Sequence, residues 1–479
     1  MPAICQEFSN YFREKSSNKS LNPPNIAALE PMQFDSSCSK IYNSLFTLRE
    51  LNQAIHSTKN SSPGPDGITT PMIKNLPHKY LLLLLEFYNY IWLHEVFPDS
   101  WHHSILIPIH KQGKPRNLLS SYRPISLTDH LCKILERMVL FRLSWYLESK
   151  QILSSYQNGF RPKKSTIDHL SSMENDINIA LSRKHHLVAT SLDLSNAFDT
   201  TWKYQILHQM KSLDLSGHLP SFISNFLKDR SFSVRINSNL SPPSYLENGV
   251  PQGSVLSPTL FLLAINPIQH YISTPIKYRL FADDLLIYHS SPYHTNCTSS
   301  LQDTLNRLTE WSNTSGFSFS PSKSSTTHIC NIRNCPKITS LQLNNTHIPY
   351  TPTFKFLGLI FDEKHNSHLC TQIQDFKKDL NILKFLSHTT WGSDQPSLLK
   401  IYKSVILPKL NYGDFIYDSS CESYKKMLDP IQNQALRLAL YRYASKEPFP
   451  SLPTQHLLRP VLPLIFPLIS CPTILQFAH

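Results

Sequence analysis

Apolar and polar positions follow different patterns in different parts of the chain. Between residues 45 and 362, short apolar runs bounded by turn residues alternate with amphipathic helical stretches. From 363 to 445 the pattern is helical, and 446–479 is broken by many prolines, which predicts a poorly defined tail. Residues 1–44 are polar and rich in Ser, Asn and Pro, which predicts a linker or the tail of a missing upstream region.

Helices are expected from periodicity and from capping signals. Thr47 to Glu50 form a capping box followed by apolar residues on one face, so a helix should begin there. Further helical patterns cover 80–97, 129–149, 165–182, 201–228 in two segments, 255–271, 300–315, 410–417 and 431–440. Charged and polar residues interrupt the most apolar of these, 80–97, so it predicts a packed helix and not a bilayer span.

Strands are expected where apolar runs meet turn residues. Residues 105–109 and 123–127 should pair as a hairpin around a basic turn, and 232–236 alternates as a half-buried strand does. An apolar run from Leu187 leads into the acid Asp193.

Tyr278–Tyr288 reads as a hairpin with two carboxylates, Asp283 and Asp284, at its tip. Burying carboxylates between apolar strands is costly unless a cation or hydrogen bonds compensate, and a divalent metal is the leading explanation. The alternative is a solvated turn, since Asp is a favoured turn residue. Together with Asp193, these carboxylates could hold two metal ions about 3.5 to 4 Å apart, the arrangement used in phosphoryl transfer.

The order of three segments resembles the reverse transcriptase region of non-LTR (LINE-type) retrotransposons, with jockey-like elements the most similar. Asp193 lies in what resembles motif A, Asn248–Phe261 resembles motif B, and Phe281–Asp284 resembles motif C. The resemblance implies an α+β right-hand polymerase, with fingers and a palm built on an antiparallel sheet in 45–362 and a helical thumb in 363–445. It implies an RNA-directed DNA polymerase, a nucleotidyltransferase.

The resemblance also implies roles for individual residues. Asp193, Asp283 and Asp284 would ligate two Mg²⁺ ions, with Mn²⁺ possible in their place. Lys323, in a segment similar to motif D, would be the general acid for the pyrophosphate leaving group, although an exposed structural lysine is the alternative.

Substrate contacts follow from the same resemblance. Lys111 and Arg123 are expected on the triphosphate, and Gln252 and Gly253 beside the bound nucleotide or duplex. Phe198 is expected under the sugar as a steric gate against a 2′ hydroxyl, the alternative being ordinary core packing. Contacts to nucleic acid are expected from a basic segment and from a segment similar to motif E: Arg161, Lys163 and Lys164 on the template, and Phe356, Leu357 and Gly358 at the primer end.

Composition limits the partners and the compartment. A formal net charge of +12 and a pI near 9.1 favour polyanions, although a membrane surface or a ribosomal partner would fit the same balance. The nine cysteines are scattered without a Cys-x-x-Cys pair, which predicts free thiols. With no signal peptide visible, we expect an intracellular protein, nuclear or cytoplasmic, that uses an RNA template, a DNA primer and dNTPs but no membrane. The oligomeric state stays open.

Two alternatives remain at this point. A decayed copy could bind nucleic acid without catalysis, although the acidic residues and the glycine turn are all present. An RNA-dependent RNA polymerase shares the metal carboxylates but places a polar residue where this chain has Phe198. No endonuclease pattern is visible upstream, so the chain is expected to extend a primer but not to nick a target.

Overall fold

The computed structural model describes residues 2–17, 32, 34–35, 40–332, 338, 340–364, 368–388, 391–413 and 429–440. The chain divides into two compact units, Met1–Gly358 and Leu359–His479. Strands and helices are mixed, so the coarse α+β expectation is confirmed. The predicted tail at 446–479 lies outside the described residues.

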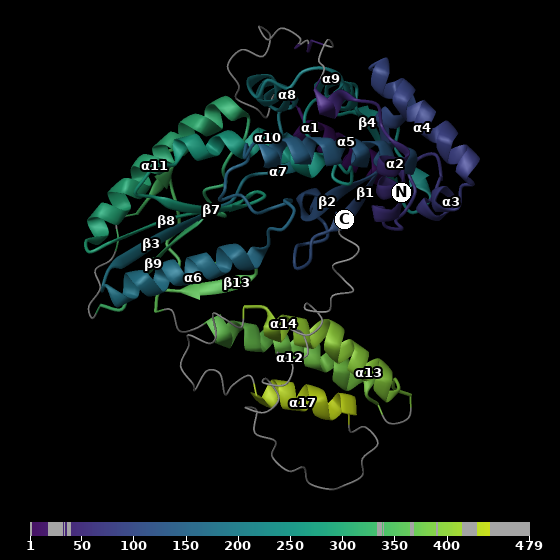
Figure 1. The fold of residues 1–479 in the computed structure, drawn as a ribbon. Coiled ribbons are helices and arrows are strands. Elements are labelled where there is room, and N and C mark those ends of the chain that lie inside the picture. The colour runs from purple at the N-terminus through teal and green to yellow at the C-terminus, as the bar shows by residue number, and fades with distance from the viewer. Residues whose placement is uncertain are drawn as a thin grey trace, which may run out of the picture. The chain divides into compact units, whose positions relative to one another are not determined.

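A four-stranded antiparallel sheet forms the middle of the first unit. Its strand order is β7 (Lys277–Phe281), β8 (Asp284–Ser291), β3 (His186–Leu192) and β9 (Ser325–Ile329). Figure 1 shows α6 (Thr166–Ser182) on one side of this sheet and α11 (His294–Ser315) on the other. The predicted hairpin at 278–288 is confirmed, and its turn lies between β7 and β8.

A second sheet has the order β2 (Tyr122–Leu127), β1 (His103–His110), β4 (Ser231–Ile236) and β5 (Asn239–Leu240), with β6 (Ser244–Tyr245) also paired to β4. The predicted β1–β2 hairpin is confirmed, with Ile109 opposite Arg123. β4 runs parallel to β1, a pairing that joins distant parts of the chain.

Helices and the small elements complete the first unit. They are α2 (Leu48–Ser57), α3 (Thr70–Lys74), α4 (His78–Leu93), α5 (His130–Ser149), α7 (Ala197–Thr200), α8 (Lys203–Ser212), α9 (His218–Leu227), α10 (Ser257–Ile265), the 3₁₀ helix η6 (Asn266–Tyr271), and the strands β10 (Gln342–Leu343), β11 (Thr346–His347) and β12 (Thr353–Phe356). The predicted capping box before α2 is present, with Thr47 and Glu50 bonded to each other's backbone. Two predicted bounds differ: α4 ends before the left-handed Glu95, and α11 begins already at His294.

The N-terminal segment corrects one expectation. Residues 2–15, predicted as part of a linker, form helix α1 (Pro2–Lys15). Cys5, Phe8 and Phe12 are buried on one face, and the two rings pack in a cluster with Phe232 and Val234 of β4. This apolar stripe is narrow and polar residues surround it, so its helical spacing could not be recognised in the sequence.

The second unit is mainly helical, as predicted for 363–445. It contains β13 (Leu359–Asp362), α12 (His368–Leu386), α13 (Gln395–Ile401), the π-helix η7 (Tyr402–Ile406), α14 (Leu407–Asn411) and α17 (Asp429–Leu440). The helix expected at 410–417 is present at 410–411 but wrong at 412–413, because α14 ends at Asn411 and Gly413 turns with a positive φ of 84°. Residues 414–417 lie outside the described part. Among the described helices, none is long and apolar enough to cross a bilayer.

Candidate active site

Three carboxylates meet at one end of the four-stranded sheet. Asp193 directly follows β3, whose last residue, Leu192, pairs with Leu285 of β8. The next position in this antiparallel register brings Asp193 beside Asp284. Asp283 lies in the β7–β8 turn, where Ala282 has a positive φ of 57°. The register of adjacent strands thus brings together carboxylates that lie far apart in the sequence.

Electrostatics in this cluster favour a bound cation. Burial and the charge of Asp193 raise the pKa of Asp283, although Arg123 opposes the shift. Desolvation and the charges of Asp283 and Asp193 raise the pKa of Asp284 to about 6, even though part of that side chain is exposed. The ammonium of Lys323 lies 3.3 Å from Oδ2 of Asp193. Hard carboxylate oxygens that repel one another and already attract an ammonium fit a divalent metal such as Mg²⁺.

The loop that carries Lys323 is bonded to the end of β3. The Ser195 amide donates to the Ser318 carbonyl, and the Ser320 amide donates to the Asp193 carbonyl. The Asp193 amide donates to the Ser324 hydroxyl. These contacts hold the Lys323 loop next to the carboxylates. The general-acid role that the resemblance implies for Lys323 stays a prediction.

The segment Gln157–Gly159 clamps the β7–β8 turn, a role that sequence reasoning missed. Oε1 of Gln157 accepts from the amides of Gly159 and Ala282, and Nε2 donates to the Ala282 carbonyl. A Cβ on Gly159 would meet the Ala282 backbone. The turn that carries Asp283 is therefore shaped by backbone contacts with a distant loop.

Arg161 bonds this same loop. Its guanidinium forms a two-point ion pair with Glu148 at 2.8 and 2.6 Å and donates to the carbonyls of Ser154 and Gln157. Its side chain is only 8% exposed. These contacts give Arg161 a structural role, and its expected template contact stays a prediction, while Lys163 and Lys164 are exposed.

Phe198 lies where the segments similar to motifs A and B meet. Its ring stacks on Phe261 of α10 at 4.7 Å and meets Phe160 edge-on at 6.0 Å. The Val250 amide donates to its carbonyl. The ring is half-buried, so one side is packed and another remains accessible.

The turn at 249–253 is held by backbone contacts with β2. The Ser126 amide donates to the Gln252 carbonyl, and a Cβ on Gly253 would meet the Ser126 carbonyl oxygen. Nε2 of Gln252 donates to Oδ1 of Asp199 at 3.0 Å. Burial raises the pKa of Asp199, although the charges of Lys15 and Lys111 oppose the shift. Asp199 is a half-buried acid of the site that the sequence had not singled out.

Glu136 of α5 fixes the start of α10. Its Oε2 accepts from the Ser254 hydroxyl at 2.5 Å and from the amides of Val255 and Leu256. A buried carboxylate on free amides at a helix N-terminus is a strong cap. Nothing in the local sequence around Glu136 signals this contact, because it joins positions more than a hundred residues apart.

Positive side chains gather around Lys111. Burial and the charges of Lys15, Arg123 and Lys323 lower the pKa of Lys111, so these three cations lie near it. Lys15, the last residue of α1, donates to Oδ1 of Asn196 at 3.1 Å. The neighbouring Ser16 carbonyl accepts from the amide of Asn248. Helix α1 therefore reaches the segments similar to motifs A and B, which the linker expectation missed.

The expected primer-end residues lie at a tight turn after β12. The Phe356 side chain is buried, whereas Gly358 is exposed. Leu357 and Gly358 both have positive φ, 47° and 91°. Contact with a primer through this segment would therefore use the turn backbone rather than the Phe356 ring.

Known proteins match this chain over most of its length. The family described as "Reverse transcriptase (RNA-dependent DNA polymerase)" matches residues 109–361. The chain is 30% identical over 401 residues to the "RNA-directed DNA polymerase from mobile element jockey" of Drosophila funebris, covering 82% of this chain and 43% of that protein.

Two further relatives agree with this match. The chain is 29% identical over 392 residues to the "Probable RNA-directed DNA polymerase from transposon X-element" of Drosophila melanogaster, covering 80% of this chain and 42% of that protein. It is 27% identical over 329 residues to a "Retrovirus-related Pol polyprotein" from the type-1 element R2 of Popillia japonica, covering 65% and 44%. The chain thus spans less than half the length of each of these relatives.

Proposed function

Because the chain belongs to the reverse transcriptase (RNA-dependent DNA polymerase) family, we propose that it extends a DNA primer by copying an RNA template, with dNTPs as substrates. The observation that carries the proposal is the meeting of Asp193, Asp283 and Asp284 at one sheet end, with Lys323 bonded to Asp193 and further cations gathered around Lys111. Carboxylates for metal and cations for phosphate are what nucleotidyl transfer requires. Much of each relative lies outside the match, so further activities of a longer polyprotein are not part of this proposal.

The carboxylates of Asp193, Asp283 and Asp284 would hold Mg²⁺, two ions in the full arrangement, and Mn²⁺ could take the same oxygen ligands. A bound divalent ion lowers the pKa of an attacking hydroxyl and neutralises phosphate charge. Asp193 neighbours both the β8 strand and the Lys323 loop, so its carboxylate would be shared between metal binding and the contact with Lys323.

The cations of the chain bind and orient the triphosphate. Arg123 and Lys15 both lie near Lys111, and a bound anion would relieve the repulsion on the Lys111 ammonium. Lys323 would exchange its contact with Asp193 for one with the leaving pyrophosphate, to which its ammonium donates a proton.

Phe198, Gln252 and Gly253 would shape the nucleotide pocket. The accessible side of the Phe198 ring would exclude a 2′ hydroxyl, and its stack on Phe261 keeps the ring from moving aside. Gly253, which has no side chain, lies against the Ser126 carbonyl of β2, and this contact would fix the Gln252–Gly253 backbone beside the nucleotide.

The right-hand arrangement belongs to the same proposal. The sheet of β1, β2 and β4 would be the fingers, the sheet of β3, β7, β8 and β9 the palm, and the helical unit that begins at Leu359 the thumb. Lys163 and Lys164 would contact the template, and the Leu357–Gly358 turn the primer.

Primer extension with the purified chain tests the proposal. On an RNA template with dNTPs and Mg²⁺, Asp283→Asn should lower the rate by orders of magnitude, because a lost carboxylate removes charge stabilisation of the transition state. Binding of a primer–template hybrid should change little. Asp303→Asn, at an exposed position of α11, is the matched control. A wild-type chain that binds the hybrid but extends nothing would favour the decayed-copy alternative, and equal rates for Asp283→Asn and wild type would refute the metal assignment.

A further inference from the structure

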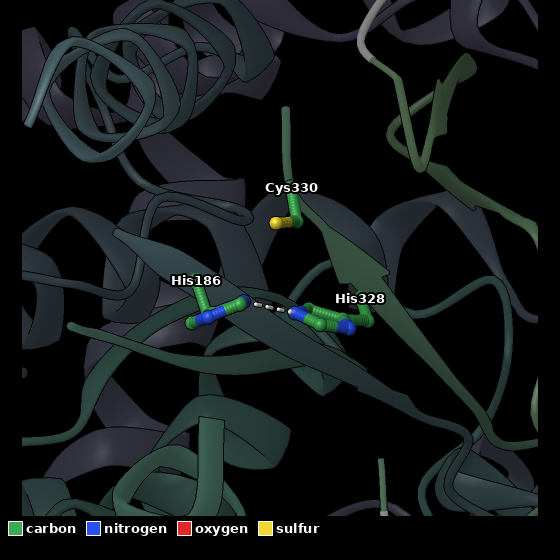
Figure 2. A group of neighbouring side chains, drawn as sticks. All are labelled: His186, His328 and Cys330. Carbon is green, nitrogen blue, oxygen red and sulfur yellow. Dashed lines mark hydrogen bonds between the residues drawn. The ribbon is translucent and has the colours of Figure 1, made fainter. Parts of the chain in front are cut away.

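A second group of ligand-type side chains lies at the opposite end of β3 from Asp193. His186 is the first residue of β3, and β3 pairs with β9 so that Leu187 faces Ile329. The next position in this register brings His186 opposite Cys330. His328 precedes Cys330 by two residues and so projects from the same face of the sheet. Strand pairing thus gathers two imidazoles and a thiol on one face (Figure 2).

The three side chains are close and buried. Nδ1 of His186 lies 3.0 Å from Nε2 of His328, and one ligand atom from each residue lies within 4.8 Å of the others. The exposed fractions are 6%, 5% and 2% for His186, His328 and Cys330. A tetrahedral zinc site with bonds of about 2.0–2.3 Å separates its ligand atoms by roughly 3.4–3.6 Å. The two imidazole nitrogens lie slightly closer than that value and no pair of ligand atoms exceeds 4.8 Å, so side-chain rotations would bring the three atoms to ligand spacing.

Ligand chemistry and burial favour one class of metal. Two imidazole nitrogens and a thiolate suit Zn²⁺, whereas Mg²⁺ prefers oxygen ligands. All three side chains are buried, which suits a structural metal site closed to solvent.

Helix α11 brings a fourth donor to the edge of this group. The ring of His294 lies 5.6 Å from the ring of His186, at 89° to it. Within the described part of the chain, Nδ1 of His294 is buried without a hydrogen-bond partner. The His294 ring would have to rotate toward the other three residues for that nitrogen to reach a metal ion.

We propose that His186, His328 and Cys330 bind one Zn²⁺ ion, with His294 or a water in the fourth position. The Cys330 thiol releases its proton to solvent on binding. The ion would join β3, β9 and the first turn of α11, and it would hold in place the strand that ends at Asp193. This site is separate from the carboxylates, so the zinc proposal can be tested independently of the polymerase proposal.

Cobalt substitution of the full chain tests the site directly. A thiolate bound to Co²⁺ gives a charge-transfer absorption that oxygen ligands at the carboxylate cluster do not give. We expect that band to saturate at one Co²⁺ per chain, to disappear on adding Zn²⁺, and to be absent in Cys330→Ser. Cys132→Ser is the control, because that buried cysteine bonds Glu136 in α5, away from this group.

Measurements of metal content and thermal stability give a second test that does not depend on absorption. Purified wild type should retain about one zinc per chain after dialysis, while His328→Gln should retain none and should no longer gain thermal stability from added Zn²⁺. No thiolate band in the wild type at saturating Co²⁺, or an unchanged band in Cys330→Ser, would overturn the proposal and leave a hydrogen-bonded histidine pair.

Discussion

The ring of Phe198 is held on one side by Phe261 and remains accessible on another. Replacing Phe198 by Val should open space for a 2′ hydroxyl, so ribonucleotide incorporation should rise at least tenfold relative to deoxynucleotide. The ratio of kcat/KM for a ribonucleotide and the matching dNTP measures this change.

Phe87→Val, at an exposed position of α4, is the control for a general decrease in the stability of the protein. If the wild type already used both sugars equally, the gate assignment would fail and an RNA polymerase activity would regain support.

Lys15 was not expected at the site at all, and its effect can be measured separately. Lys15→Ala should raise KM for dNTPs roughly tenfold, because one charged hydrogen bond to the substrate is lost. Binding of the primer–template hybrid should be unchanged. Arg13→Ala, an exposed position on the same helix, is the matched control. Equal effects of the two substitutions would mean that Lys15 acts only through the overall charge of α1.

At the scale of elements, one ion pair holds α2, α5 and the loop before α2 together. Arg142 of α5 pairs with both oxygens of Glu50 and donates to the carbonyls of Tyr42, Ser44 and Leu45. Burial opposes ionisation of Glu50, but hydrogen bonds from Arg142 and Thr47 outweigh it and lower the pKa of Glu50.

The sign of the pH dependence follows from this shift. A carboxyl whose pKa is lower in the folded state stabilises the fold above its unfolded pKa, about 4.3 for Glu, and the stabilisation is lost as the pH falls through the folded pKa. The free energy of unfolding should therefore fall more steeply with acid in wild type than in Glu50→Gln. Denaturant titrations between pH 3 and pH 7 would measure this, and parallel curves would contradict it.

Elements with local signals could be predicted, and those that depend on distant contacts could not. The Thr47 capping box and the β7–β8 turn are each determined by a few neighbouring residues. The Gln157 clamp, the Glu136 cap and the Lys15 contact join positions more than a hundred residues apart, so no short pattern reports them. The cluster at His186 and Cys330 escaped a search for Cys-x-x-Cys for the same reason, because its spacing is set by strand register.

At the scale of the whole molecule, the charge of +12 predicts how the chain binds nucleic acid. Affinity for an RNA–DNA hybrid should fall steeply between about 50 and 200 mM salt, because each neutralised phosphate releases counterions. Replacing Lys163 and Lys164 by Ala should flatten the slope of log Kd against log salt. A salt-independent Kd in the wild type would exclude a groove that binds through phosphate contacts.

The docking of α1 on β4 also orders events during synthesis. Phe8 and Phe12 bury themselves against Phe232 and Val234, which leave the ribosome more than two hundred residues later. The β1–β2 hairpin can close at once, but β1 must wait for its parallel neighbour β4, and α1 must wait for the same strand. Contacts of such long sequence separation form late, because loop closure must precede them. Helix α1 is translated before the strands of both sheets but is therefore among the last of these elements to dock, and Lys15 reaches the active site only when the sheet of β1 and β4 is complete.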